Sequence, residues 1–117
     1  MPRDLISRTV VSLRASDLAC SAPTFIKIPT NIVISSRPPS RAYFYCKARG
    51  IPTPTITWLK DRVQLTTNDH YVILEDGTLE ILQPGKNDEA RYRCVARNSA
   101  GRQVKSARLI YHEEEGT

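Results

Sequence analysis

The sequence predicts an all-β protein, an antiparallel sandwich or barrel that forms a single domain. The chain has 117 residues, an ordinary size for one domain. From residue 23 onward, short segments of alternating or β-branched residues recur about every ten residues, as strands separated by tight turns do. The five glycines and eight prolines stand mostly between these segments. One short helical turn, near residues 86–89, is the exception that we expect.

The first predicted strand pieces lie on the two sides of Pro29, at residues 25–28 and 31–34. A proline cannot donate a hydrogen bond to a central ladder, so this segment is expected at the edge of a sheet. The next segment, residues 42–48, alternates strictly between two faces. One of these faces, expected to point into the core, carries Ala42, Phe44, Cys46 and Ala48.

Turn signals separate the remaining strands. Asp76-Gly77 is a typical tight hairpin turn, and residues 98–101 form a second one. We expect the strands that these turns connect at residues 55–60, 63–65, 71–74, 78–82, 92–97 and 104–111. With the first segments they make about seven or eight strands, enough for two packed sheets.

The two ends of the chain differ from this pattern. Residues 1–22 lack the apolar stretch of a signal peptide. We expect a flexible leader, a spliced or non-native end, or a linker from a longer protein; a weak amphipathic helix or an added edge strand at residues 9–13 is the alternative. Residues 112–117 read as an acidic, solvated tail. The domain itself is therefore expected at residues 23–111.

The net charge of +5 and the pI of about 9.4 favour acidic partners. Nucleic acid is not expected, because no aromatic and basic motif of a nucleic-acid-binding module is present. Heparan sulfate is another polyanion that this charge could attract, although scattered surface arginines and lysines explain the charge equally well. No apolar run is long enough to span a bilayer, so we expect no membrane insertion by this chain.

Catalytic chemistry is not expected in this chain. His70 and His112 fall in a predicted loop and in the tail, and no spacing of cysteines or histidines suits a metal site. The glycines are isolated in turns and form no phosphate-binding loop. We therefore expect no catalytic, cofactor or metal-binding residue and no enzyme, although a parent protein could carry a catalytic domain elsewhere.

Three cysteines make an odd count. If Cys46 and Cys94 bond, Cys20 is left over, free or bonded outside the chain. Such a bond would favour an oxidising compartment. Two buried thiols at the same positions in a cytosolic protein are the alternative.

The spacing of these residues resembles the immunoglobulin superfamily, and within it the I-set. The resemblance covers residues 23–111 and depends on Cys46, Trp58, Leu79-Glu80-Ile81 and the run Asp88-x-Ala90-x-Tyr92-x-Cys94. It implies an immunoglobulin-like sandwich whose two sheets are pinned by a Cys46–Cys94 disulfide. It also implies that Tyr92 returns its hydroxyl to nearby backbone. The structural core is expected to contain Phe44, Trp58, Leu79, Ile81 and Tyr92.

The resemblance implies that the chain recognises another protein outside the cell, in a cell-adhesion, receptor or matrix protein. The partner would be a second copy or a different protein, with neighbouring immunoglobulin or fibronectin-type domains in the same chain. An intracellular structural module of a muscle or cytoskeletal scaffold is the alternative, and it would be cytoplasmic.

Strand alternation indicates which side chains such a partner would meet. If Tyr92, Cys94 and Ala96 point into the core, the residues between them point outward. The predicted partner-binding face then contains Leu59, Arg93, Val95, Arg97, Val104 and Arg108. Arginines among apolar residues are typical of protein interfaces. An ordinary solvated sheet is the other interpretation of the same pattern.

Overall fold

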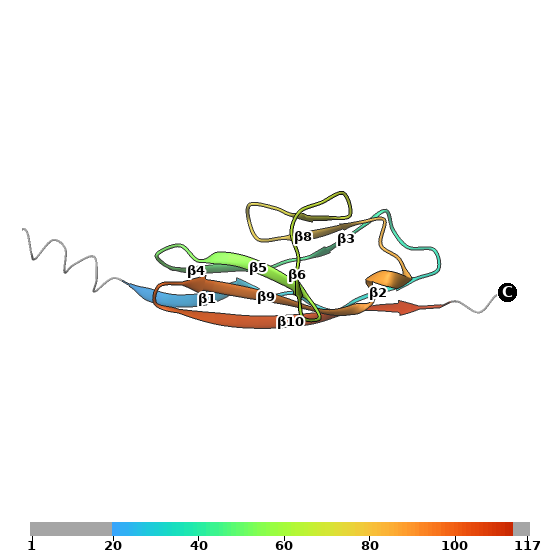
Figure 1. The fold of residues 1–117 in the computed structure, drawn as a ribbon. Helices are drawn as coiled ribbons and strands as arrows, with labels where there is room; N and C mark the ends of the chain where they lie inside the picture. The colour runs from blue at the N-terminus through green and yellow to red at the C-terminus, as the bar shows by residue number, and fades with distance from the viewer. Residues whose placement is uncertain (1–19, 114–117) are drawn as a thin grey trace, which may run out of the picture.

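The structure, a computed structural model, describes residues 20–113. The interpretations of residues 1–19 and 114–117 lie outside the described residues. The elements in chain order are β1 (Ser21–Lys27), β2 (Ile32–Ser35), β3 (Arg41–Phe44), β4 (Lys47–Ile51), β5 (Thr55–Lys60), β6 (Val63–Gln64), β7 (Tyr71–Ile73), β8 (Leu79–Leu82), the 3₁₀ helix η1 (Lys86–Asp88), β9 (Ala90–Asn98) and β10 (Gly101–His112). The described part of the chain is an all-β sandwich (Figure 1).

One layer is a five-stranded sheet in the order β2-β10-β9-β5-β6. The other layer contains the β3-β8-β7 and β1-β4 sheets. The predicted single strand at residues 42–48 is two strands here, since β3 pairs with β8 and β4 pairs with β1. Tyr45 and Cys46 lie between the two pieces and belong to neither.

Other boundaries also differ from the sequence pattern. β1 begins at Ser21, two residues before the expected start of the domain, because Ser21 pairs with Ile51 of β4. β2 pairs with β10 in parallel, whereas every other strand pairing in the described residues is antiparallel. The segment around Pro29 therefore crosses from one layer to the other, because its two strands belong to different sheets.

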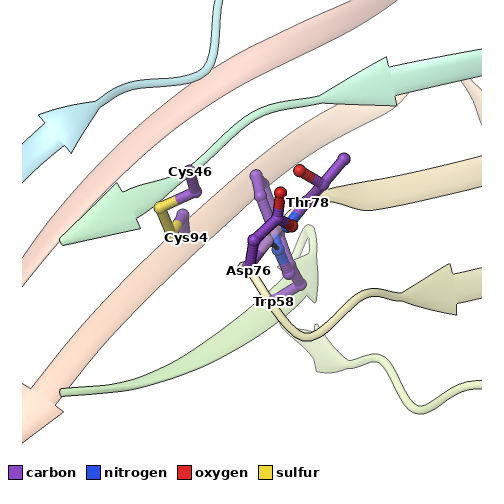
Figure 2. Close-up of a disulfide and its surroundings, with 6 residues drawn as sticks. Cys46, Trp58, Asp76, Thr78 and Cys94 are labelled. Atoms are coloured by element: carbon purple, nitrogen blue, oxygen red, sulfur yellow. Dashed lines mark hydrogen bonds between the residues drawn. A yellow bond between two sulfur atoms is a disulfide. The ribbon is translucent and has the colours of Figure 1, made fainter. Parts of the chain in front are cut away.

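The core lies between the two layers. Phe44, Trp58, Leu79, Ile81 and Tyr92, the five core residues expected from the sequence, are all fully buried. The Cys46–Cys94 disulfide bridges the layers next to Trp58, with the two Cα atoms 6.5 Å apart (Figure 2). Burial of large aromatic side chains dominates the stability of such a small core.

Two hydrogen bonds fix the loops that close this core. The Trp58 indole donates to the Gly77 carbonyl at 2.8 Å, and the Tyr92 hydroxyl donates to the Asp88 carbonyl at 2.6 Å. Each polar tip is thus satisfied although its ring is buried. Among residues 20–113, no helix is long and apolar enough to cross a membrane.

Candidate recognition surface

The outward side of β5, β9 and β10 carries all six residues that the sequence assigns to the partner-binding face. Register pairs across the sheet show this directly, because directly opposite residues share a face. Leu59 lies opposite Arg93, and Val95 lies opposite Val104. The same face includes two arginines that the sequence analysis missed. The arginine face, as we call it, consists of Leu59, Arg91, Arg93, Val95, Arg97, Arg102, Val104 and Arg108.

The middle of the arginine face is apolar. Leu59 and Val95 are partly buried by their neighbours, and Val104 is 40% exposed. A shallow hollow of about 260 Å³ lies beside them, with its lining formed by Thr55, Thr57, Leu59, Gln64, Val95, Arg97 and Arg102. A partner side chain could displace water from this hollow and bury apolar surface there.

Arginines stand on both sides of this apolar middle. Arg97 lies directly opposite Arg102, and Arg91 lies directly opposite Arg108. Like charges in this arrangement repel each other and destabilise a sheet. No carboxylate in residues 20–113 lies within ion-pair distance of these four guanidinium groups. No ion pair within the described chain therefore offsets this repulsion.

A second hollow, of about 420 Å³, opens at the end of the face near Arg91 and Arg108. Asp61 and Glu89 also line it, so this end is less strongly basic. Asp61 accepts a hydrogen bond from the backbone N–H of Arg91 at 3.2 Å, and Glu89 accepts one from Tyr111 at 3.3 Å. The two carboxylates are thus committed to backbone groups of β9 and β10.

The outward side of the opposite layer differs in its charge pairing. Arg41 there forms an ion pair with Glu80 at 2.9 Å, and Glu80 is almost fully buried. Tyr43 and Tyr45 stack with ring centroids 6.1 Å apart, and the Lys27 ammonium lies 5.5 Å from the Tyr45 centroid. The sequence analysis named only the core-facing residues of residues 42–48 and left these two tyrosines out. Their alternation was the signal that could have identified this second surface.

Asp88 is a buried carboxylate that the sequence assigned only to a family motif. Its Oδ1 accepts hydrogen bonds from His70 at 2.7 Å and Tyr71 at 2.9 Å, and its Oδ2 accepts one from the Gly85 N–H at 2.8 Å. Burial acts to raise the pKa of Asp88, but the bonds from His70, Gly85 and Tyr71 outweigh it and hold that pKa below its ordinary value. Asp88 therefore has a structural role, and its backbone carbonyl accepts the hydrogen bond from the Tyr92 hydroxyl.

The histidines and carboxylates of the described part of the chain are not arranged as a metal site. No group of three or more histidine, cysteine, aspartate or glutamate side chains is placed to hold a metal ion there. His70 meets a single carboxylate, and His112 is exposed at the end of β10.

Comparisons with known proteins agree with this architecture. The model of the immunoglobulin I-set domain family matches residues 23–110. Human probable oxidoreductase PXDNL is 34% identical over 94% of this chain, and human Roundabout homolog 1 is 35% identical over 92% of it. The chain spans only 8% and 7% of the length of these two relatives.

Solved structures show the same similarity. A chain of the titin M10–obscurin-like 1 immunoglobulin complex superimposes with a TM-score of 0.74 at 27% identity. The match covers 82% of this chain and 99% of that one. The likeness thus extends over almost the whole of the other domain.

Proposed function

The chain belongs to the immunoglobulin I-set family, and on that premise we propose that it is a non-enzymatic, extracellular protein-recognition module of a cell-adhesion, receptor or matrix protein. The observation that carries the proposal is the arginine face, with its apolar middle and with guanidinium groups that form no ion pair within residues 20–113. Leu59, Val95 and Val104 would anchor the partner, and the arginines around them would select an acidic one.

The arrangement suits a protein partner better than a polyanion alone. A sulfated glycan would use the arginines but would gain little from the apolar middle. A protein with an apolar patch and acidic neighbours would use both, because it would bury the apolar middle and meet the arginines with opposite charge. Heparan sulfate is therefore a secondary candidate, supported by the charge of +5.

The compartment is inferred from the Cys46–Cys94 disulfide, because such bonds persist in oxidising surroundings. The likeness to a titin immunoglobulin domain favours the alternative, an intracellular structural module. Counting thiols in the native protein under denaturing, non-reducing conditions separates the two. One free thiol at most supports the extracellular proposal, and three support the intracellular one.

Neighbouring domains are part of the proposal. The chain covers less than a tenth of the relatives described above, so the parent protein would carry further domains beside it. We propose that immunoglobulin or fibronectin-type domains flank it. Any catalytic activity of a parent protein would lie outside this immunoglobulin domain.

An array of extracellular proteins, probed with a multivalent form of the chain, tests the proposal. We expect partners whose binding is lost in Leu59→Asp and in Arg93→Glu. Ile26→Asp is the matched control, because Ile26 is a 46% exposed apolar residue on β1, in the opposite layer. Partners that bind all three variants equally would refute the assignment of this face.

Heparan sulfate binding has its own test. Retention of the chain on a heparin column above physiological salt would support it, since several arginines must then act together. Elution below that salt concentration would exclude the glycan and would leave the protein-recognition proposal intact.

A further inference from the structure

The first half of β10 has an edge that no strand covers in the described part of the chain. β10 pairs with β9 over residues 101–109, but β2 joins its other edge only over residues 109–112. β1, which precedes β2 in the chain, pairs with β4 in the opposite layer instead. The crossing at Pro29 therefore leaves residues 102–106 of β10 without a neighbouring strand on one side. We call this segment the open edge.

One hydrogen bond identifies the backbone groups that face the open edge. The Arg108 N–H donates to the Asn31 side-chain oxygen at 2.8 Å, so it points away from β9. In a strand, alternate residues direct their N–H and C=O groups to the same edge. Arg102, Val104 and Ser106 therefore direct theirs to the open edge. No residue in 20–113 offers them a hydrogen-bond partner.

The open edge is accessible and has defined ends. All five residues from 102 to 106 are exposed, although their side chains alternate between the two faces of the sheet. At one end, Ala22 of β1 lies 3.2 Å from the position that a Cβ on Gly101 would take. At the other end, the Asn31 side chain accepts the Arg108 N–H, and β2 pairs with β10 from Leu109 onward. The gap of roughly 13 Å between them suits about five residues of an added strand.

Charge decides which kind of strand could enter. Arg102, Lys105 and Arg108 border the open edge, and none has a carboxylate within ion-pair distance in the described chain. A second copy added antiparallel about Lys105 would place that lysine opposite its own copy and Arg102 opposite Arg108. Such like-charge pairs are destabilising, so this register is unfavourable for a second copy. An acidic segment would instead meet the opposite charge on both faces.

We propose that the open edge binds an extended acidic segment of a partner protein, which joins the sheet as an additional strand. The backbone groups of Arg102, Val104 and Ser106 supply the hydrogen bonds, and the neighbouring basic side chains select acidic residues. This inference rests on the proposed role in protein recognition, but it requires neither Leu59 nor Arg93.

The probe is a synthetic peptide of about eight residues in which glutamate alternates with valine and threonine, capped at both ends. Hydrogen exchange of the full chain, followed by NMR at saturating peptide, measures the protection of each backbone amide along the open edge. We expect the amides of Arg102, Val104 and Ser106 to become protected. The amides of Gln103 and Lys105, which face β9, serve as internal controls and should keep the protection that they already have.

N-methylated peptides separate strand pairing from simple charge attraction. Methylation of one alternate set of peptide amides should abolish binding, and methylation of the other set should leave it unchanged. Equal binding of both methylated peptides, or unprotected amides at the three edge residues, would overturn the proposal. A heparin oligosaccharide that binds while the peptide does not would point to a polyanion surface and would overturn it too.

Charge reversal supplies the second arm. Lys105→Glu should weaken peptide binding by about tenfold or more, whereas Lys86→Glu, which changes the net charge equally at the exposed helix η1, should change it by less than about twofold. Leu59→Asp should not affect the peptide. If array partners are lost in Leu59→Asp while the edge amides stay unprotected, the edge proposal fails alone and the proposed function stands.

Discussion

The indole Nε1 of Trp58 lies 2.8 Å from the carbonyl oxygen of Gly77, which it meets as a hydrogen-bond donor. Trp58 belongs to β5 in one layer, and Gly77 lies in the turn between β7 and β8 in the other. The bond and the Cys46–Cys94 disulfide therefore join the same two layers, and Figure 2 shows the disulfide near Trp58. The tryptophan is a polar link between sheets as well as an apolar filler.

Trp58→Phe should destabilise the domain by about 2–4 kcal/mol, because it leaves the Gly77 carbonyl without its donor and removes part of a fully buried ring. Urea denaturation measures the change. Tyr45→Phe, at a half-exposed ring, should change the midpoint little. A Trp58→Phe variant as stable as the parent chain would contradict the importance of this link.

Gly77→Ala tests the turn itself. Gly77 has a φ of +100°, and a Cβ there would collide with the carbonyl oxygen of Cys46. Both effects disfavour a side chain, so we expect a loss of about 2 kcal/mol or more in the free energy of unfolding. Gly85→Ala is the matched control, because nothing lies within 4 Å of its added Cβ. Thermal unfolding of the two variants should differ clearly, and equal melting temperatures would count against this account.

Protonation of Asp88 should lower the free energy of unfolding in acid. Its pKa is held below the ordinary value in the folded state, so the carboxylate contributes stability above about pH 4 and loses it as the pH drops through the lowered pKa. Asp88→Asn should be less stable at neutral pH, by about 2 kcal/mol, and should flatten the loss of stability below pH 4. Denaturation curves between about pH 2 and pH 7 measure both effects.

Asp69→Asn provides the comparison for that series. Asp69 is exposed and its side chain makes no hydrogen bond to residues 20–113, so its variant should follow the parent chain at every pH. If Asp88→Asn also followed the parent chain, the buried network with His70 and Tyr71 would not be the source of the acid sensitivity.

Arg97→Glu should stabilise the domain slightly while weakening a partner that uses the arginine face. The substitution replaces a like-charge pair with Arg102 by an opposite-charge pair, which is worth about 0.2–1 kcal/mol. Arg41→Glu should do the reverse for stability, because it breaks the ion pair with Glu80. Melting temperature and array binding, measured on the same samples, would show whether stability and recognition change in opposite directions.

Strand periodicity explains which core and surface residues could be predicted from the sequence. Phe44, Trp58 and Tyr92 were predictable as core because alternation and motif spacing agree on them. The outward residues of β9 followed from the same alternation. The pairing of Arg91 with Arg108 was missed, although it follows once the predicted turn at residues 98–101 closes with Asn98 opposite Gly101.

Contacts between distant loops were beyond such reasoning. His70 reaches Asp88 across 18 residues of sequence, and no local pattern specifies that approach. The open edge of β10 was also hidden, because it depends on which layer each half of residues 21–35 joins. Pro29 signalled a break in the strand, but it did not indicate that the chain changes layers there.

The parallel pairing of β2 with β10 has a mechanical consequence. β1 begins at one end of the sandwich and β10 runs to the other, so the ends of the domain leave in opposite directions (Figure 1). Tension between them would pull β2 and β10 past each other along their length. The bonds over residues 109–112 would then be loaded in shear and share the force, rather than opening one after another. A chain under tension would thus be held by the four residue pairs that join β2 to β10.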